Sequence, residues 1–169
     1  ALRREGVLTP GYFFTDLTVN GKYIGIMAVE EHFSKELLES QGRKEGVILK
    51  YDESLWFKPR GSGGPFDSFR TNPIVPFRKN KISKSKNLSK DLKIAIGLLR
   101  GFANGTLDVA QVFDAELWGK YYAVASIWGG WHSIQWRNIR FYYNPITAKL
   151  EPIAFDEQLK YFKRKSFEP

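Results

Sequence analysis

The chain has 169 residues, of which 43% are hydrophobic and 15% aromatic, and this is enough apolar material for the core of one globular domain. Cysteine is absent, which excludes disulfides, thiol catalysis and zinc sites built on cysteine. The formal net charge is +8, and the longest uncharged run, residues 121–136, is too short and too polar to form a transmembrane segment.

Residues 12–29 predict a β-hairpin. Two runs rich in aromatic and β-branched residues flank Asn20 and Gly21, and these two residues accept the positive φ angles of a tight turn. A serine that can act as N-cap and a C-terminal glycine predict a short helix over residues 34–41. We expect the hairpin to pack against this helix.

A third strand is predicted at residues 47–51, and an irregular segment follows over residues 54–90. Glycine and proline interrupt this segment repeatedly, and its length is unusual for a loop inside a compact domain. We therefore interpret residues 58–90 as an irregular, basic insertion.

A basic run extends from the end of this insertion into the following helix. It consists of Arg78, Lys79, Lys81, Lys84, Lys86, Lys90 and Lys93. The run could attract nucleic acid, anionic surfaces or acidic protein substrates, or it could simply be a solvated loop leading into a helix. Aromatic residues do not alternate with the lysines, which argues against nucleic acid.

The C-terminal half predicts two helices and a second hairpin. Apolar residues at helical spacing begin after Ser89 and end near Asn104. Asp114 can cap a second helix, in which helical spacing favours burial of Trp118 and Trp128. The last hairpin consists of strands 139–143 and 150–155, and Asp156 follows it.

The order of these elements has a chemical consequence. A helix leads into a loop that delivers Asn138, and a hairpin then leads to Asp156. In protein kinases this order brings an asparagine and an aspartate together on the magnesium ions that bridge the ATP phosphates. From spacing alone, Asn138 could equally cap a turn, and Asp156 could cap the segment 157–163.

Three segments of the chain resemble the spore coat protein H kinase-like family. They are Val19–Ile26 followed by Glu30 and Glu31, then Asn138–Tyr142, and finally Glu151–Asp156. The resemblance implies an α+β, atypical protein-kinase-like fold with a small β-rich lobe and a helical lobe. The match begins inside the family domain, so we expect a single, truncated domain.

The expected lobes follow from the resemblance. Residues 1–57 would form the β-rich lobe, with a hairpin, a helix and a strand. Residues 91–169 would form the helical lobe, which carries a two-stranded metal-site hairpin over residues 139–155. The basic insertion would separate the two lobes.

The resemblance also implies ATP and Mg²⁺ or Mn²⁺ as ligands, with protein Ser/Thr as the acceptor. Asp156 matches the metal-binding aspartate and Asn138 matches the second metal ligand. Lys50 matches a lysine that reaches the nucleotide phosphates, and its ionic partner would be Glu31 or Glu30. A surface Lys–Glu pair without a ligand is the alternative for these residues.

One departure from the family bears on activity. Family kinases place an aspartate before the asparagine as a general base, whereas no acidic residue lies between Glu116 and Glu151. The nearest candidate is His132, since histidine can accept a proton near neutral pH. A histidine beside Trp131 and Ser133 could instead be a hydrogen-bonded structural residue.

Three functions therefore stay open, and one of them is electrostatic binding of polyanions through residues 78–93. The chain could be an atypical ATP- and divalent-metal-dependent protein kinase-like domain, weak or inactive in phosphotransfer. It could instead be a non-catalytic kinase-like module that binds a protein partner or a cell surface. Family resemblance favours the cell envelope or the extracellular space as its location.

Overall fold

The computed structural model describes residues 1–53 and 72–157. Within them the fold is mixed α+β, as expected, with two antiparallel sheets. The strands are β1 (Tyr12–Val19), β2 (Lys22–Glu30), β3 (Ile48–Tyr51), β4 (Ile74–Pro76), β5 (Arg140–Asn144) and β6 (Lys149–Ile153). The helices are η1 (Leu2–Glu5), α1 (Lys35–Glu39), α3 (Lys79–Ser83), α4 (Lys86–Ala103), α5 (Val109–Val112) and α6 (Ala115–Trp128).

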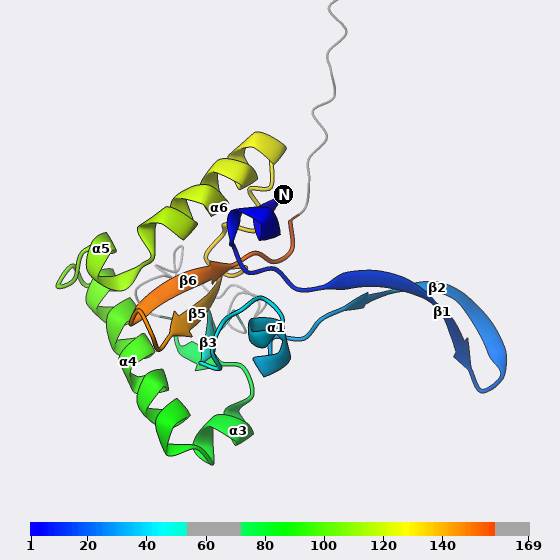
Figure 1. Cartoon of the computed structure of the whole chain (residues 1–169), viewed down its shortest axis with the longest axis horizontal. Helices are drawn as coiled ribbons and strands as arrows, with labels where there is room; N and C mark the ends of the chain where they lie inside the picture. Colours follow the sequence, from blue (N-terminus) through cyan, green and yellow to red (C-terminus); the bar gives the residue numbers. More distant parts are fainter. Residues whose placement is uncertain (54–71, 158–169) are drawn as a thin grey trace, which may run out of the picture.

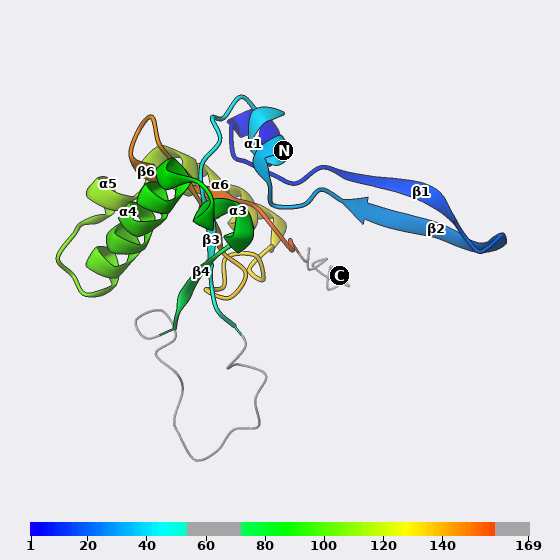
Figure 2. The ribbon, with the colours of Figure 1, turned by 90° about the horizontal axis from the view of Figure 1, so that it is seen from below.

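The predicted N-terminal hairpin is confirmed, and β1 and β2 pair with each other alone in their sheet. Its turn lies at Asn20 and Gly21, whose φ angles are 50° and 76°. The expected packing against α1 is wrong, because the hairpin projects away from the rest of the chain (Figures 1 and 2). Phe14 and Ile26 are 69% and 70% exposed.

The second sheet has the strand order β4-β3-β5-β6. In its centre Lys50 of β3 lies opposite Arg140 of β5, and Ile48 lies opposite Tyr142. Strand β3 was expected in the β-rich lobe and β5 in the helical lobe. The sheet therefore crosses the boundary that sequence reasoning placed between the two lobes.

Each face of this sheet covers a separate hydrophobic cluster, because successive side chains of a strand point to opposite faces. Leu49, Tyr51 and Phe141 belong to the cluster that includes α4 and α6. Ile48 and Tyr142 belong to the other cluster, with residues of α1 and the N-terminal segment. Figure 1 shows α4 and α6 on one side of the sheet and α1 on the other.

Helix α6 begins and ends as the sequence predicts. The side chain of Asp114 accepts a hydrogen bond from the backbone N–H of Leu117, and Gly129 takes a left-handed conformation at the C-terminus. Trp118 is buried as expected, but Trp128 is 56% exposed. Trp128 lies at the last residue of the helix, where no further turn covers it.

The prediction of an irregular segment up to residue 90 is wrong for its described part. Residues 72–90 contain β4, α3 and the first turns of α4, while residues 58–71 of the expected insertion lie outside the described residues. Helix α4 begins earlier than predicted, since the N-cap is Ser85, which accepts a hydrogen bond from the N–H of Leu88. Strand β6 ends at Ile153, so Asp156 lies three residues beyond it.

Among the helices of residues 1–53 and 72–157, none combines the length and the apolar character that crossing a bilayer requires.

Candidate functional site

His132 and Asp156 lie in contact beside the end of the second sheet. Nε2 of His132 is 2.9 Å from Oδ2 of Asp156, and the two side chains are 25% and 35% exposed. Asp156 has a φ of 55°, a left-handed conformation that aspartate tolerates better than most residues. The contact joins the loop after α6 to the segment after β6.

Buried hydrogen bonds fix the loop that carries His132. Ser133 is fully buried, and its hydroxyl donates to the carbonyl of Gly130 at 2.8 Å. The hydroxyl of Tyr121, on α6, donates to the carbonyl of Ser133 at 3.1 Å. Because polar groups without water need protein partners, these bonds restrict the loop to one arrangement.

Asn138 lies on the same loop and contacts its backbone. Asn138 is buried, and its side-chain nitrogen donates a hydrogen bond to the carbonyl of His132 at 2.8 Å. This hydrogen bond directs the amide nitrogen at the loop, so the amide oxygen is the atom of this side chain that could act as a cation ligand. His132 thus contacts both predicted metal ligands, Asp156 through its ring and Asn138 through its carbonyl.

Lys50 lies on the face of the sheet that carries the α1 cluster, and it pairs with Glu53 rather than with Glu31 or Glu30, the two expected partners. Nζ of Lys50 donates to Oε1 of Glu53 at 3.0 Å. Oε2 of Glu31 accepts instead from the N–H of Gly11 at 2.8 Å, at the base of the projecting hairpin. Glu53 lies two residues beyond the end of β3, close enough in sequence to reach Lys50. Glu31 lies at the base of the hairpin, where it contacts Gly11.

Arg140 belongs to the same face of the sheet, and sequence reasoning missed it. It is 5% exposed, and its guanidinium lies 4.7 Å from the ring centroid of Phe155 and 5.9 Å from those of Phe33 and Phe77. Burial lowers its pKa, and the nearby carboxylates of Glu53 and Asp156 act in the opposite direction. The available signal was a cation between Ile139 and Phe141, inside an otherwise apolar and aromatic predicted strand.

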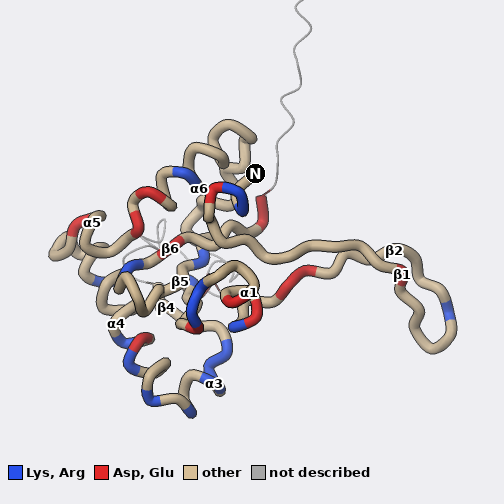
Figure 3. The backbone as a smooth tube through the Cα atoms, in the orientation of Figure 1, with Lys and Arg blue, Asp and Glu red and all other residues tan. Residues whose placement is uncertain are grey.

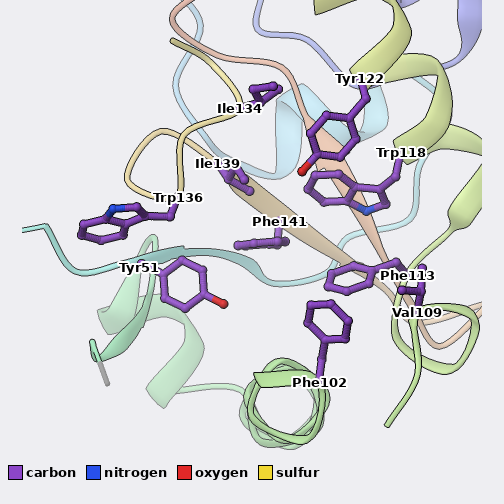
Figure 4. A pocket seen from close by; sticks show the side chains of 10 residues that line it. All are labelled: Tyr51, Phe102, Val109, Phe113, Trp118, Tyr122, Ile134, Trp136, Ile139 and Phe141. Carbon is purple, nitrogen blue, oxygen red and sulfur yellow. The ribbon is translucent and has the colours of Figure 1, made fainter. Parts of the chain in front are cut away.

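Two pockets lie near the candidate site residues. An open pocket of about 490 Å³ adjoins Asp156, and Glu30 and Glu157 are among the residues that line it. A second pocket of about 340 Å³ is lined by aromatic and aliphatic side chains, including Tyr51 and Phe141 (Figure 4). The alternation of the strands places this apolar pocket on the face opposite Lys50 and Arg140.

The basic run of the sequence occupies α3 and the first turns of α4, where Lys and Arg gather in Figure 3. Arg78 and Lys81 form ion pairs with Glu36 and Glu45. Lys79 and Lys84 are exposed. The sequence predicted a loop leading into a helix, and the structure places Lys79, Lys81 and Lys86 of the expected loop on helices as well.

No protein-family model matches the chain, and no curated protein matches it. Among the described residues, no three His, Cys, Asp or Glu side chains form a group that could hold a metal ion. The chemistry of the site therefore rests on five side chains, those of Asp156, Asn138, His132, Lys50 and Arg140.

Proposed function

We propose that the chain is an atypical kinase-like domain that binds ATP with Mg²⁺ or Mn²⁺ and transfers phosphate weakly or not at all. The observation that carries this proposal is the 2.9 Å contact between His132 and Asp156. Resemblance to the spore coat protein H kinase-like family supplies the class of ligand. Protein Ser/Thr is the acceptor that the resemblance implies.

The donor atoms suit the proposed cation. The Asp156 carboxylate and the Asn138 amide oxygen are hard oxygen donors, which Mg²⁺ and Mn²⁺ prefer. Both residues contact His132, Asp156 at the imidazole ring and Asn138 at the backbone carbonyl, so His132 connects the two proposed ligands. Two protein ligands are sufficient for a cation whose remaining ligands are phosphate oxygens and water.

The cationic side of the site suits the nucleotide phosphates. Lys50 is 27% exposed and lies on the central strand of the sheet. The ATP, when bound, would supply the phosphoryl group. Since phosphoryl transfer depends mainly on positioning and on neutralising charge, Lys50 would hold the phosphates in place.

His132 accounts for weak transfer in this proposal. With Nε2 directed at Asp156, only Nδ1 could accept the proton of an acceptor hydroxyl. An aspartate in this position orients an imidazole, as in other acid–base pairs. The Asp156 carboxylate is also the proposed metal ligand. A cation bound to it would therefore compete with His132, which weakens both the metal site and the orientation of the imidazole.

Nucleotide binding is tested by thermal unfolding of the chain with ATP and either Mg²⁺ or Mn²⁺. Ligand at 100 times its Kd stabilises a folded protein by about 2.7 kcal/mol. Asp156→Asn should abolish the metal-dependent part of this stabilisation, because it removes the charge that holds the cation. Asp16→Asn, on the exposed hairpin, is the matched control and should keep it.

Transfer is tested with radiolabelled ATP and a generic protein acceptor. General base catalysis contributes about 10²–10⁴-fold, so a chain that lacks the usual aspartate should be slow. If His132 substitutes for that base, His132→Ala should lower turnover by about tenfold or more while nucleotide affinity changes little. Rapid transfer that survives His132→Ala would show that another group is the base.

A second candidate is a non-catalytic kinase-like module that binds a protein or a cell surface. The projecting hairpin favours it, since Phe13, Phe14, Tyr23 and Ile26 are each more than half exposed. Exposed apolar patches of this kind often mark interaction sites. If neither Mg²⁺ nor Mn²⁺ supports any nucleotide binding, this second function is favoured.

A further inference from the structure

We infer that Arg140 is a phosphate-binding residue, which acts with Lys50 on an oxyanion that displaces the carboxylate of Glu53. The inference deepens the proposed function, on which it rests for the identity of the ligand. It assigns the phosphate contacts to a pair of cations on neighbouring strands rather than to Lys50 alone.

The hydrogen bonds of Arg140 leave part of its guanidinium without an acceptor. Both bonds that it makes to described residues leave from Nη1, to the carbonyls of Arg137 at 2.7 Å and Ile139 at 3.3 Å. Its Nε is buried and has no hydrogen-bond partner among the described residues. A buried donor without an acceptor is costly, and the Nε edge is one of the two edges with which arginine can bind carboxylates and phosphates through two parallel hydrogen bonds.

Three phenylalanine rings surround the guanidinium of Arg140. Phe33, Phe77 and Phe155 contribute ring faces or edges within 5.9 Å, and cation–π contacts recover only part of the cost of desolvation. A buried arginine is therefore rarely favourable for stability alone. The three rings restrict its rotamers, which preorganises the free edge for a ligand.

Lys50 and Glu53 complete the arrangement. Lys50 is the cross-strand partner of Arg140, and both cations lie 5.9 Å from the ring centroid of Phe77. Glu53 accepts a hydrogen bond from Lys50. Among the charged groups near Arg140, the carboxylate of Glu53 does most to raise the pKa of the guanidinium. One carboxylate thus faces two cations, and at 25% exposure it can swing into solvent. Asp156 is the second carboxylate that acts on Arg140, and an incoming phosphate would take the place that Glu53 leaves beside the two cations.

The probe for this inference is tripolyphosphate without metal, because it carries the anionic chemistry of ATP without the adenosine. Binding is measured by calorimetry with the whole chain. Removing one charge-assisted contact should weaken binding by about tenfold or more in Arg140→Met and in Lys50→Gln. Glu53→Gln should tighten binding by about threefold or more, because the competing carboxylate is gone.

Arg140→Met also separates a binding role from a structural one. Replacing a buried ion by an apolar residue of similar volume is often neutral or stabilising, so thermal unfolding of Arg140→Met should occur at an unchanged or higher temperature. A large drop in that temperature with unchanged affinity would overturn the inference. If the variant does not fold, the opposite shifts in Lys50→Gln and Glu53→Gln still decide the question, and two unchanged affinities reject it.

The matched control is the double variant Lys79→Gln and Lys84→Gln in the exposed basic run. It should leave tripolyphosphate affinity unchanged. If this variant removes binding and Arg140→Met does not, the basic run is the anion site and the inference fails. If tripolyphosphate binds but ATP with metal does not, the anion-binding role of Arg140 stands and the proposal of nucleotide binding is rejected. Binding of ATP and metal that is equal in Arg140→Met and wild type would keep the proposed function and reject this role.

Discussion

At the scale of single residues, Glu151 is a buried charge that connects separate segments. It is 2% exposed, and its carboxylate accepts from Nε of Arg43 at 2.7 Å and from the side-chain nitrogen of Asn144 at 2.6 Å. Arg43 follows α1, whereas Glu151 and Asn144 belong to the β5-β6 hairpin. The carboxylate therefore joins the α1 side of the molecule to the sheet.

Glu151→Ala should destabilise the chain, since it leaves the buried amide of Asn144 without an acceptor. Such a loss costs roughly 1–3 kcal/mol, and urea unfolding followed by circular dichroism would measure it. Glu39→Ala is the matched control, because Glu39 pairs with Lys35 at 51% exposure. That exposed pair should contribute about 0.5 kcal/mol or less. Equal losses in the two variants would contradict a structural role for Glu151.

Sequence reasoning found part of the candidate site at this scale. The order of helix, loop and hairpin predicted that Asn138 and Asp156 converge, and His132 was named separately as the nearest replacement for the missing base; both predicted ligands contact His132. Sequence reasoning failed to pair Lys50, because Glu31 and Glu53 are both acidic and near a strand end, and only the three-dimensional path of the hairpin distinguishes them. Arg140 was missed because its importance depends on three phenylalanines that are distant in sequence.

At the scale of secondary-structure elements, α4 contains two glycines with different surroundings. A Cβ added at Gly97 meets no heavy atom within 4 Å, whereas one added at Gly101 would lie 2.5 Å from Cδ1 of Leu107. Both positions lie inside an 18-residue helix. The difference between them is therefore packing rather than helix propensity.

Gly97→Ala should stabilise the chain by about 0.5–1 kcal/mol, because alanine restricts the unfolded chain and favours the helix. Gly101→Ala gains the same propensity but must displace the Leu107 side chain, and overpacking costs about 1–3 kcal/mol. Thermal unfolding of the two variants beside wild type should give shifts of opposite sign. Shifts of the same sign and size would mean that Leu107 moves freely.

Local sequence patterns were sufficient to predict some secondary-structure elements but not others. The turn at Asn20 and Gly21 and the cap at Asp114 were predicted because their side-chain and backbone preferences are local. Strand β4 was missed because it contains Pro76. An edge strand tolerates a proline, and β4 is at the edge of its sheet, but the position of a strand in a sheet cannot be read from local sequence.

At the scale of the whole molecule, the pairing of β3 with β5 determines where the site lies. This pairing places Lys50 opposite Arg140 and joins two segments that the sequence analysis assigned to different lobes. Alternation of side chains identifies the faces of a strand but not its neighbours. For that reason the elements were largely predictable, while the sheet that connects them was not.

The two sheets of the molecule should differ in local stability. The β1-β2 hairpin is exposed along almost all of both strands, and an isolated two-stranded hairpin is only marginally stable in water. Strand β5 is buried at all five of its residues. The amides of a segment that opens locally exchange faster than those that need global unfolding.

Hydrogen exchange followed by mass spectrometry tests this difference. Cross-strand amides of β1 and β2 should exchange at least about a hundredfold faster than those of β5, because their opening needs far less free energy than global unfolding. The measurement is repeated at tenfold lower protein concentration as a control for association between copies. Slow hairpin exchange that persists on dilution would show that the hairpin is held by the rest of the same chain. Slow exchange that disappears on dilution would show that its apolar side chains are covered by another copy.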